Sequence, residues 1–394
     1  MLDYKSGIAA RVKGLEGSAT VSVMDKARRL RSEGRNVVDL SGGDPDFPTA
    51  PNVTEAGIQA MREGFTHYAP SRGIPQLLQA IANKLRSENG AAYDPQREII
   101  VMPGAKQTIF VAAQALLNPG DDVILFDPAW VSYAPCAELA GARPVYVPMS
   151  TQTSPQQLRA GLESAISPST RLIIVNSPGN PTGQVWTREQ LDVVADAAKS
   201  HNIWVMSDEI YEKLIFDGLK HISIASLPGM LERTMIVNGL SKSHAMTGWR
   251  LGYIAGPAPL ISEMLKIHQH SSTCAPSFVQ KASVIAFEGP QDYTDYMVGR
   301  YKQRRDMLVA GLNAIPGITC EAPQGAFYAW PDIVGTGLSS SEFTDRLLDA
   351  EAVAVTPGQA FGPAGEGFVR LSFANSDEML ADGVERIRRT MAKL

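Results

Sequence analysis

Short runs of apolar and β-branched residues recur along the chain from about residue 97. Each run ends at Gly, Pro, Asp or Asn, and a helical stretch often follows it. Nearly continuous apolar strands are typical of a sheet that is buried on both faces. Their alternation with helices predicts an α/β fold whose sheet is mostly parallel. Seven strands are predicted, over residues 98–102, 122–126, 144–148, 171–175, 203–206, 234–238 and 251–255.

Several of the predicted helices have clear start signals. Thr187 to Gln190 and Ser339 to Glu342 fit the capping box, in which two side chains satisfy the first free backbone groups of a helix. Pro75 fits the first position of another helix, because its fixed φ suits that position. Leucines and other apolar residues follow each signal at helical spacing.

The last hundred residues have a different pattern. A charged helix around 296–314 is followed by a mixture of short strands and one helix, which predicts a smaller α+β domain. We therefore expect a large domain over residues 48–290 and a small domain formed by residues 1–47 and 291–394. The predicted elements of the small domain are strands over 318–320, 326–330 and 368–373 and a helix over 340–350.

Composition excludes several classes of protein. The chain has 394 residues and a net charge of −5, so it has no overall attraction to nucleic acid or anionic membranes. It has no run of about 20 apolar residues and no secretory signal, so we expect no membrane span and a place in the cytoplasm. Its cysteines are too far apart for a redox or zinc motif and are expected to be ordinary thiols: Cys136, Cys274 and Cys320.

Polar residues follow several of the predicted strands. In an open α/β sheet, ligands bind beyond the carboxyl ends of the strands. Gly104 and Ala105 follow the first strand and precede a helix, where backbone N–H groups can hold a phosphate. Asn180, Asp208 and Lys242 follow later strands. These strand ends together offer an anion cradle, an amide, a carboxylate and an amine.

Residues 239–252 (GLSKSHAMTGWRLG) resemble the cofactor-lysine signature of class I/II aminotransferases. These are fold-type I enzymes that use pyridoxal 5′-phosphate. The resemblance covers almost the whole chain. Further motifs agree with it in order and spacing: SGGDPDF at 41–47, HYAPSRGIP at 67–75, DPAWVSY at 127–133, NSPGNPTG at 176–183, SDEIY at 207–211 and FVRLSFA at 368–374.

The resemblance implies a role for each strand-end residue. Lys242 would form a Schiff base with the cofactor and then move a proton as general base and acid. Asp208 would pair with the protonated pyridine nitrogen. Tyr211 and Asn180 would bond the 3′ oxygen of the ring, and Trp130 would stack on its face.

The phosphate would be held at the start of a helix and by a neighbouring subunit. Tyr68 would reach it from that subunit, which implies a homodimer with shared active sites. The family often has a serine where this chain has Gly239, so Ser241 or Ser243 is expected to substitute for it. The other implied phosphate contacts are Gly104, Ala105, Lys106 and Arg250.

The substrates would be an amino acid and a 2-oxo acid. Arg370 would bind the α-carboxylate through its planar fork, and Gly43 would let backbone approach it. Thr20 and Lys106 resemble residues near the distal carboxylate in bacterial aspartate aminotransferases, so aspartate or glutamate with 2-oxoglutarate or oxaloacetate is expected. Asn180 and Trp130 are also expected to contact the substrate.

Other functions stay open. The same fold could act on aromatic amino acids, alanine, prephenate or arginine with pyruvate, or as a cystathionine β-lyase-like C–S lyase. A transcriptional regulator is disfavoured, because only about 40 residues precede SGGDPDF and no basic recognition helix is evident. No metal is expected, since no further ligands accompany the pair His268 and His270. His244 is a weaker candidate base than Lys242.

Overall fold

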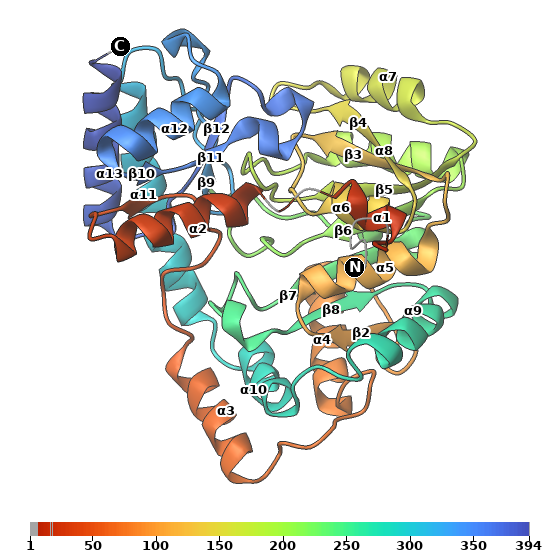
Figure 1. The fold of residues 1–394 in the computed structure, drawn as a ribbon. Helices are drawn as coiled ribbons and strands as arrows, with labels where there is room; N and C mark the ends of the chain where they lie inside the picture. Colours follow the sequence, from red (N-terminus) through yellow and green to blue (C-terminus); the bar gives the residue numbers. More distant parts are fainter. Residues whose placement is uncertain (1–6, 16, 18, 394) are drawn as a thin grey trace.

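The computed structural model describes the chain except residues 1–6, 16, 18 and 394. A seven-stranded sheet forms the centre of its larger part (Figure 1). β8 is antiparallel to both of its neighbours and the other pairs are parallel, so the predicted mostly parallel sheet is confirmed. In spatial order the strands are β2 (Ile99–Met102), β8 (Gly252–Ala255), β7 (Thr234–Gly239), β6 (Trp204–Asp208), β5 (Thr170–Asn176), β3 (Asp122–Asp127) and β4 (Arg143–Pro148).

Helices cover both faces of this sheet, which explains why most of its strands are nearly continuously apolar. Leu172 and Ile174 of β5 pack with one group of helices, and Ile173 and Val175 pack with another. This division follows from the alternation of side chains along a strand. The helices on the first face are α5 (Ala105–Leu116), α6 (Tyr133–Leu139) and α9 (Ala258–Ser271), and those on the second are α7 (Pro155–Ala165) and α8 (Arg188–Ser200).

Three further helices pack against β2, the edge strand at one end of the sheet, and against its neighbour β8. Ile99 and Val101 of β2 and Tyr253 of β8 share one apolar cluster with these helices. Pro75 is the first helical residue of the second of them, as predicted. The three are α3 (Pro51–Arg62), α4 (Pro75–Glu88) and α10 (Ser277–Glu288).

The smaller part is built around two short sheets. β1 (Val38–Asp39) pairs with β10 (Val353–Ala354), and a second sheet has the order β11 (Thr356–Pro357), β12 (Val369–Ser372), β9 (Tyr328–Ala329). The helices around them are α2 (Ala19–Ser32), α11 (Asp292–Asn313), α12 (Ser340–Glu351) and α13 (Asp377–Met391). The capping boxes predicted at Thr187 and Ser339 are both present.

One predicted strand of the smaller part is wrong. In the run 318–320, only Thr319 makes a bridge, to Asp332. The reason lies in Asn313, whose side-chain amide donates to the carbonyl of Cys320 at 3.0 Å and accepts from its N–H at 2.7 Å. The backbone groups that a strand neighbour would have used are therefore already satisfied. The run 326–330 likewise forms a strand only at Tyr328–Ala329.

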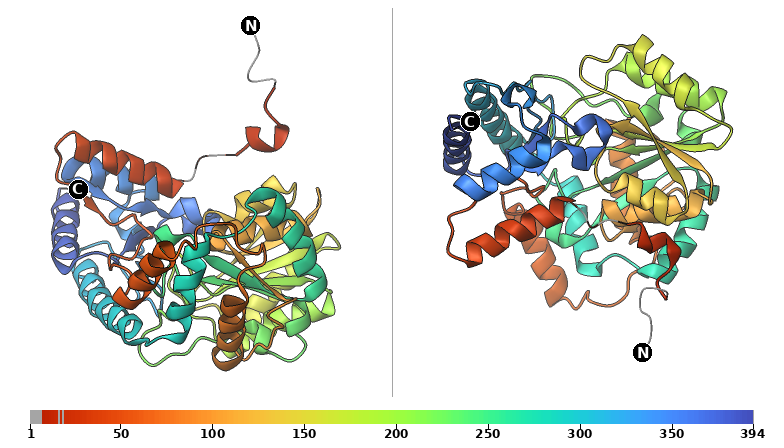
Figure 2. Two further views of the ribbon diagram at one scale, coloured as in Figure 1. Left: turned by 90° about the horizontal axis from the view of Figure 1, so that it is seen from below. Right: turned by 45° about the horizontal axis from the view of Figure 1, so that its top comes forward.

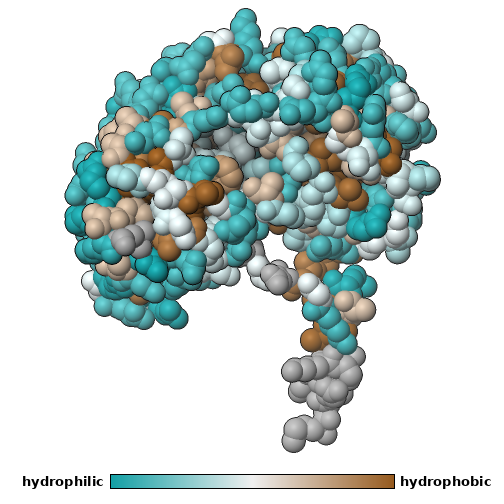
Figure 3. Space-filling view, turned by 90° about the horizontal axis from the view of Figure 1, so that it is seen from above, coloured by the Kyte–Doolittle hydropathy of each residue, from teal (hydrophilic) through white to brown (hydrophobic). Residues whose placement is uncertain are grey.

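The segment of residues 7–15 projects from the body (Figure 2) and contacts it at α6. It carries the short helix α1 (Ala10–Lys13), which Figure 2 shows projecting beyond the rest of the chain. Ile8 and Val12 are each 47% exposed there, and the segment shows hydrophobic as well as hydrophilic residues (Figure 3). Among the described residues, no helix is long and apolar enough to cross a membrane.

Candidate active site

A cavity of about 380 Å³ lies where the carboxyl ends of β5, β6 and β7 meet the smaller part. Residues that are far apart in the sequence line it, because parallel strands end at one edge of the sheet. Twelve of the predicted site residues line this cavity: Thr20, Gly43, Ala105, Lys106, Trp130, Asn180, Asp208, Tyr211, Ser241, Lys242, Arg250 and Arg370. The structure therefore brings together nearly the whole predicted set.

Lys242 supplies an amine to the cavity. It follows β7, and its Nζ donates a hydrogen bond to the backbone carbonyl of Gly43. Burial lowers the pKa of Lys242 to about 8, although the nearby carboxylate of Asp44 opposes the shift. The amine can therefore gain or lose a proton near neutral pH.

Asp208 supplies a buried carboxylate at the end of β6. Its Oδ2 accepts a hydrogen bond from the Tyr133 hydroxyl at 2.6 Å, and its Oδ1 accepts one from the Ile210 N–H at 3.2 Å. Burial raises the pKa of Asp208 to about 6, and the two hydrogen bonds offset only part of that effect. Among the described residues, no cationic side chain forms an ion pair with Asp208. A buried carboxylate of this kind suits a cationic ligand atom, such as a protonated ring nitrogen.

The start of α5 forms a cradle for an anion. Gly104 precedes the helix with φ +94°, and a Cβ there would lie 2.6 Å from a guanidinium nitrogen of Arg250. A Cβ on Gly252 would lie 2.4 Å from the nitrogen of Ala105, so both glycines are required by close approach. The first turn of a helix presents free N–H groups, and here a guanidinium lies beside them. This arrangement fits a phosphate group.

Arg370 supplies a buried cation on the opposite side of the cavity. It is 3% exposed, and its two terminal nitrogens donate to the Asn180 side chain at 3.0 Å and to the Ser41 carbonyl at 2.7 Å. Its Nε has no hydrogen-bond partner among the described residues. The guanidinium also lies 4.4 Å from the centre of the Tyr328 ring. A buried guanidinium with a free donor fits a carboxylate ligand.

Tyr328 completes this wall of the cavity and explains the glycine at position 43. The hydroxyls of Tyr211 and Tyr328 lie 2.8 Å apart. A Cβ on Gly43 would lie 2.8 Å from the Tyr328 hydroxyl, which leaves no room for a side chain. Close packing thus keeps the Gly43 carbonyl beside Lys242.

Some predicted residues lie elsewhere. Tyr68 is 86% exposed and does not line the cavity of its own chain. Of the two serines considered, Ser241 lines the cavity, whereas the Ser243 hydroxyl pairs with His244 at 2.8 Å. His244 also bonds the Ala286 carbonyl, so it is not available to the cavity.

The side chains of His268 and His270, for which no metal role was expected, point in different directions. His268 is buried and His270 is exposed on the same helix, because positions two apart point in different directions.

Sequence reasoning missed several lining residues. Tyr133 stands in the DPAWVSY motif, three residues after Trp130, but nothing in the motif reveals its bond to Asp208. Tyr328 has no local signal of its own. Ser41, Asp44 and Thr247 belong to quoted motifs but were given no role. Thr247 donates to Asp44 at 2.6 Å.

Comparison with known proteins agrees with this geometry. A family model described as aminotransferase class I and II matches residues 35–387. An aspartate aminotransferase of Musicola paradisiaca is 42% identical over 387 residues, which cover 98% of this chain and 97% of that protein. Aromatic-amino-acid aminotransferase 2 of Thermococcus litoralis is 39% identical over 357 residues, covering 90% and 92%. The structure of aspartate aminotransferase from Thermus thermophilus with maleate is 40% identical and has a TM-score of 0.92, covering 98% and 99%.

Proposed function

The chain belongs to the family of class I and II aminotransferases, and from this premise we propose that it transfers the amino group of aspartate or glutamate to 2-oxoglutarate or oxaloacetate. Enzymes of this family depend on pyridoxal 5′-phosphate. When bound, this cofactor carries the amino group between substrates and withdraws electrons from the substrate Cα. The single observation that carries the substrate assignment is that Lys106 and Arg370, two cations, line one cavity.

The cavity fits the cofactor at both of its charged ends. Asp208 forms no ion pair with any residue that the structure describes, and the glycines beside Arg250 leave a cradle at the start of α5. We assign the ring nitrogen to Asp208 and the phosphate to the cradle formed by Gly104, Ala105 and Arg250. The remaining proposed contacts are Trp130 on the ring face, Tyr211 and Asn180 at the ring oxygen, and Ser241 and the Lys106 backbone N–H at the phosphate.

Lys242 is proposed to bind the cofactor covalently and then to move the proton at the substrate Cα. The Gly43 carbonyl orients its amine, and its pKa of about 8 leaves about a tenth of it neutral at pH 7. Once the amino group of the substrate has displaced it from the cofactor, the neutral amine would accept the Cα proton, and the resulting ammonium would return that proton to C4′ of the cofactor. Arginine could not perform both steps, because it does not lose its proton in this pH range.

Arg370 is proposed to hold the substrate α-carboxylate. Asn180 and the Ser41 carbonyl fix two of its nitrogens, so the guanidinium is oriented before the substrate arrives. Fixing the carboxylate in this way places Cα next to Lys242. Proximity of this kind can supply a large part of the rate acceleration.

Lys106 and Thr20 are proposed to select a second carboxylate. The Lys106 Nζ lies 5.0 Å from the centre of the Trp130 ring, and burial lowers its pKa. A dicarboxylic substrate would restore charge balance around this amine. The resemblance to an aromatic-amino-acid aminotransferase supports a second candidate, in which the Trp130 face receives an aromatic side chain.

We also propose a homodimer in which Tyr68 contacts the phosphate in the partner's site. Its 86% exposure in the single chain supports this, as do the half-exposed Ile8 and Val12 of the projecting segment.

We also propose the division into a large domain over 48–290 and a small domain over 1–47 and 291–394, with the seven-stranded sheet wholly inside the first. Three free cysteines support a reducing compartment, which we propose is the cytoplasm.

A scan of half-reactions tests the substrate assignment. Purified, yellow holoenzyme is mixed with each of the twenty amino acids, and the loss of the visible cofactor band is followed. Aspartate and glutamate should react fastest, and Lys106→Ala should lower kcat/KM for aspartate by about 10- to 100-fold, the effect of losing one charged contact.

Lys281→Ala is the matched control. Its Nζ also lies 5.0 Å from an aromatic ring, that of Phe65, but it does not line the cavity. Faster reaction with phenylalanine or tyrosine than with aspartate would overturn the dicarboxylate assignment in favour of the aromatic one. Formation of ammonia and pyruvate without transfer of the amino group would indicate lyase chemistry instead.

A further inference from the structure

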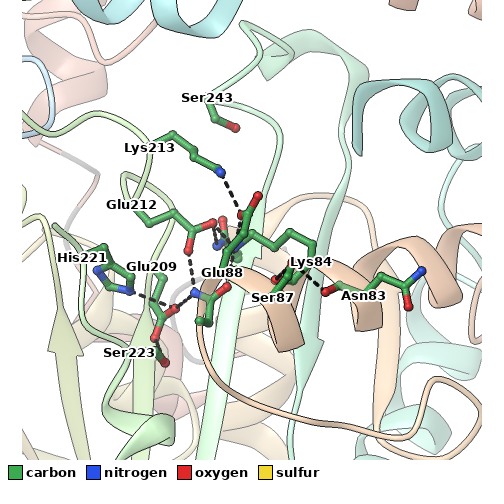
Figure 4. Close-up of polar contacts among 12 residues, drawn as sticks. Asn83, Lys84, Ser87, Glu88, Glu209, Glu212, Lys213, His221, Ser223 and Ser243 are labelled. Atoms are coloured by element: carbon green, nitrogen blue, oxygen red, sulfur yellow. Dashed lines mark hydrogen bonds and ion pairs between the residues drawn. The ribbon is translucent and has the colours of Figure 1, made fainter. Parts of the chain in front are cut away.

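A buried polar cluster lies beside the ends of β6 and β7, and the proposed reaction does not use it directly (Figure 4). Its members come from separate parts of the chain and are nearly all shielded from water. We call them the β6–β7 cluster: Lys84 and Asn89 at the end of α4, Glu209 and Glu212 after β6, His221 in the following loop, and Asn238 on β7.

Asn89 connects the two carboxylates of the cluster. Its side-chain nitrogen donates to Glu209 at 2.7 Å and to Glu212 at 2.6 Å. The ammonium of Lys84 bonds Glu212 and lies 2.8 Å from the Asn89 oxygen. His221 lies 3.1 Å from Glu209 on the other side.

The β6–β7 cluster is not built as a metal site, although Glu209, Glu212 and His221 place their polar atoms within 4.8 Å of one another. The Asn89 nitrogen and the Lys84 ammonium already bond these carboxylates where an ion would bind them. All four carboxylate oxygens accept hydrogen bonds, those of Glu209 also from Ser207 at 2.8 Å and Ser223 at 2.6 Å. Carboxylates whose oxygens are all hydrogen-bonded in this way rigidify the structure around them.

The cluster is attached to both strand ends that supply the catalytic groups. Glu209 directly follows Asp208, and its backbone N–H donates to the Val237 carbonyl of β7 at 2.9 Å. Asn238 of β7 donates to Glu212 at 2.8 Å and accepts from the Gly239 N–H at 2.7 Å. Gly239 is the last residue of β7, and the turn that bears Lys242 directly follows it. One side chain, Asn238, therefore joins that turn to the segment after Asp208.

We propose that Asn238 and Glu212 are positioning residues, which hold the turn bearing Lys242 against the strand end bearing Asp208 and so fix the placement of the amine. This inference rests on the proposed roles of Lys242 and Asp208. The contact that carries it is the hydrogen bond between Asn238 and Glu212, because Lys84 and Asn89 anchor Glu212 in turn. Without Asn238 the turn loses both its link to Glu212 and its bond to the Gly239 N–H.

Asn238→Ala removes this link without leaving a charge unpaired, since Glu212 keeps Lys84. The first measurement uses the cofactor-free protein: the rate at which a trace acylating reagent modifies Lys242, followed by mass spectrometry from pH 6 to 11. The midpoint for Lys242 should move up by at least about half a pH unit, because a loosened turn admits water and relieves the burial that lowers this pKa.

The second measurement uses the holoenzyme. Asn238→Ala should lower kcat by about 10- to 100-fold, as expected for a misplaced catalytic group. KM for the amino acid should change less than about threefold, because Arg370 is not in the turn. Asn238→Ser is a second variant for the same measurements if the alanine variant does not fold.

Asn313→Ala is the matched control. Its amide also donates and accepts, at the backbone of Cys320, but in the smaller part away from Lys242. It should leave both the Lys242 midpoint and kcat unchanged. The inference is overturned if Asn238→Ala and Asn238→Ser leave the Lys242 midpoint and kcat at the values of the control. A wild-type enzyme without turnover on any amino acid would instead refute the proposed function, since the acylation measurement does not depend on turnover.

Discussion

Asp208 and Glu209 are neighbours in the sequence, yet they face two regions with opposite chemistry. Asp208 faces the cavity, where its carboxylate accepts two hydrogen bonds and forms no ion pair within the described part of the chain, so burial raises its pKa to about 6. Glu209 faces the β6–β7 cluster, together with Glu212. There burial would raise the pKa of Glu212, but Lys84 and His221 outweigh it and bring the pKa to about 2.

The difference separates a binding group from a structural one. A buried carboxylate without a cation is costly in the empty protein, and a ligand that brings positive charge can recover that cost. A buried carboxylate that is already paired has nothing left to offer a ligand, but the fold depends on its partners. Replacing the carboxylate by its amide should therefore lower the free energy of unfolding in the β6–β7 cluster, whereas in the cavity it should remove a cost of burial.

The largest effect is expected in the cluster. Glu212→Gln leaves the buried Lys84 ammonium without its partner, which should lower the free energy of unfolding by about 3–5 kcal/mol. Urea unfolding of the cofactor-free protein measures it. Glu88→Gln is the control, because Glu88 also contacts Lys84, at 3.7 Å, but is 40% exposed. Glu88→Gln should lower the free energy of unfolding by less than about 1 kcal/mol. Equal losses in both variants would mean that the buried pair of Lys84 and Glu212 matters no more than an exposed one.

A smaller effect, with a distinct pH dependence, is expected for Asp208 in the cavity. Its pKa is higher in the folded state than the ordinary value of 3.8, so its contribution to stability is fully present below pH 3.8 and is lost as the pH rises through about 6. The cofactor-free wild type should therefore lose about 2–2.5 kcal/mol between pH 4 and pH 7 that Asp208→Asn does not lose.

Unfolding of both proteins across this pH range measures the difference. His221, whose pKa burial lowers but Glu209 raises overall, is present in both proteins, so its contribution cancels. Parallel stability curves for wild type and Asp208→Asn would show that the carboxylate is not the costly buried group described above. The contribution of Glu212 to stability depends on pH in the opposite direction. It is present above pH 4.5 and is lost only as the pH falls through about 2.

The same contrast shows what the sequence could predict. The seven strands were predictable because burial on both faces makes most of them nearly continuously apolar, and the site followed because polar residues stand directly after those strands. The two-residue strands β1 and β10 have too few residues for a pattern. The strand expected over 318–320 is wrong because a side chain, Asn313, satisfies the backbone there.

The β6–β7 cluster could not be predicted, because its contacts join distant positions. Lys84 and Glu212 are separated by 128 positions, and Asn89 and Glu209 by 120. In the sequence, each of these residues is indistinguishable from an ordinary polar residue at a helix end or in a loop. The Tyr133 bond to Asp208 spans 75 positions and has the same character.

The smallest effect is expected from Tyr133, whose hydrogen bond to Asp208 in the cavity offsets part of the rise in its pKa. Tyr133→Phe removes the 2.6 Å hydrogen bond to Asp208, and a bond to a charged group contributes about 1.5–3 kcal/mol. The pKa of Asp208 should then rise further, and the carboxylate should hold a cationic ring nitrogen less firmly. Cofactor affinity, measured by fluorescence titration at pH 7, should fall by about 10-fold or more, and the loss should shrink as the pH rises above the new pKa and Asp208 ionises again. Tyr146→Phe is the control, since this tyrosine does not line the cavity. An affinity for Tyr133→Phe equal to that of the control at every pH would mean that the hydrogen bond from Tyr133 does not help to keep Asp208 ionised.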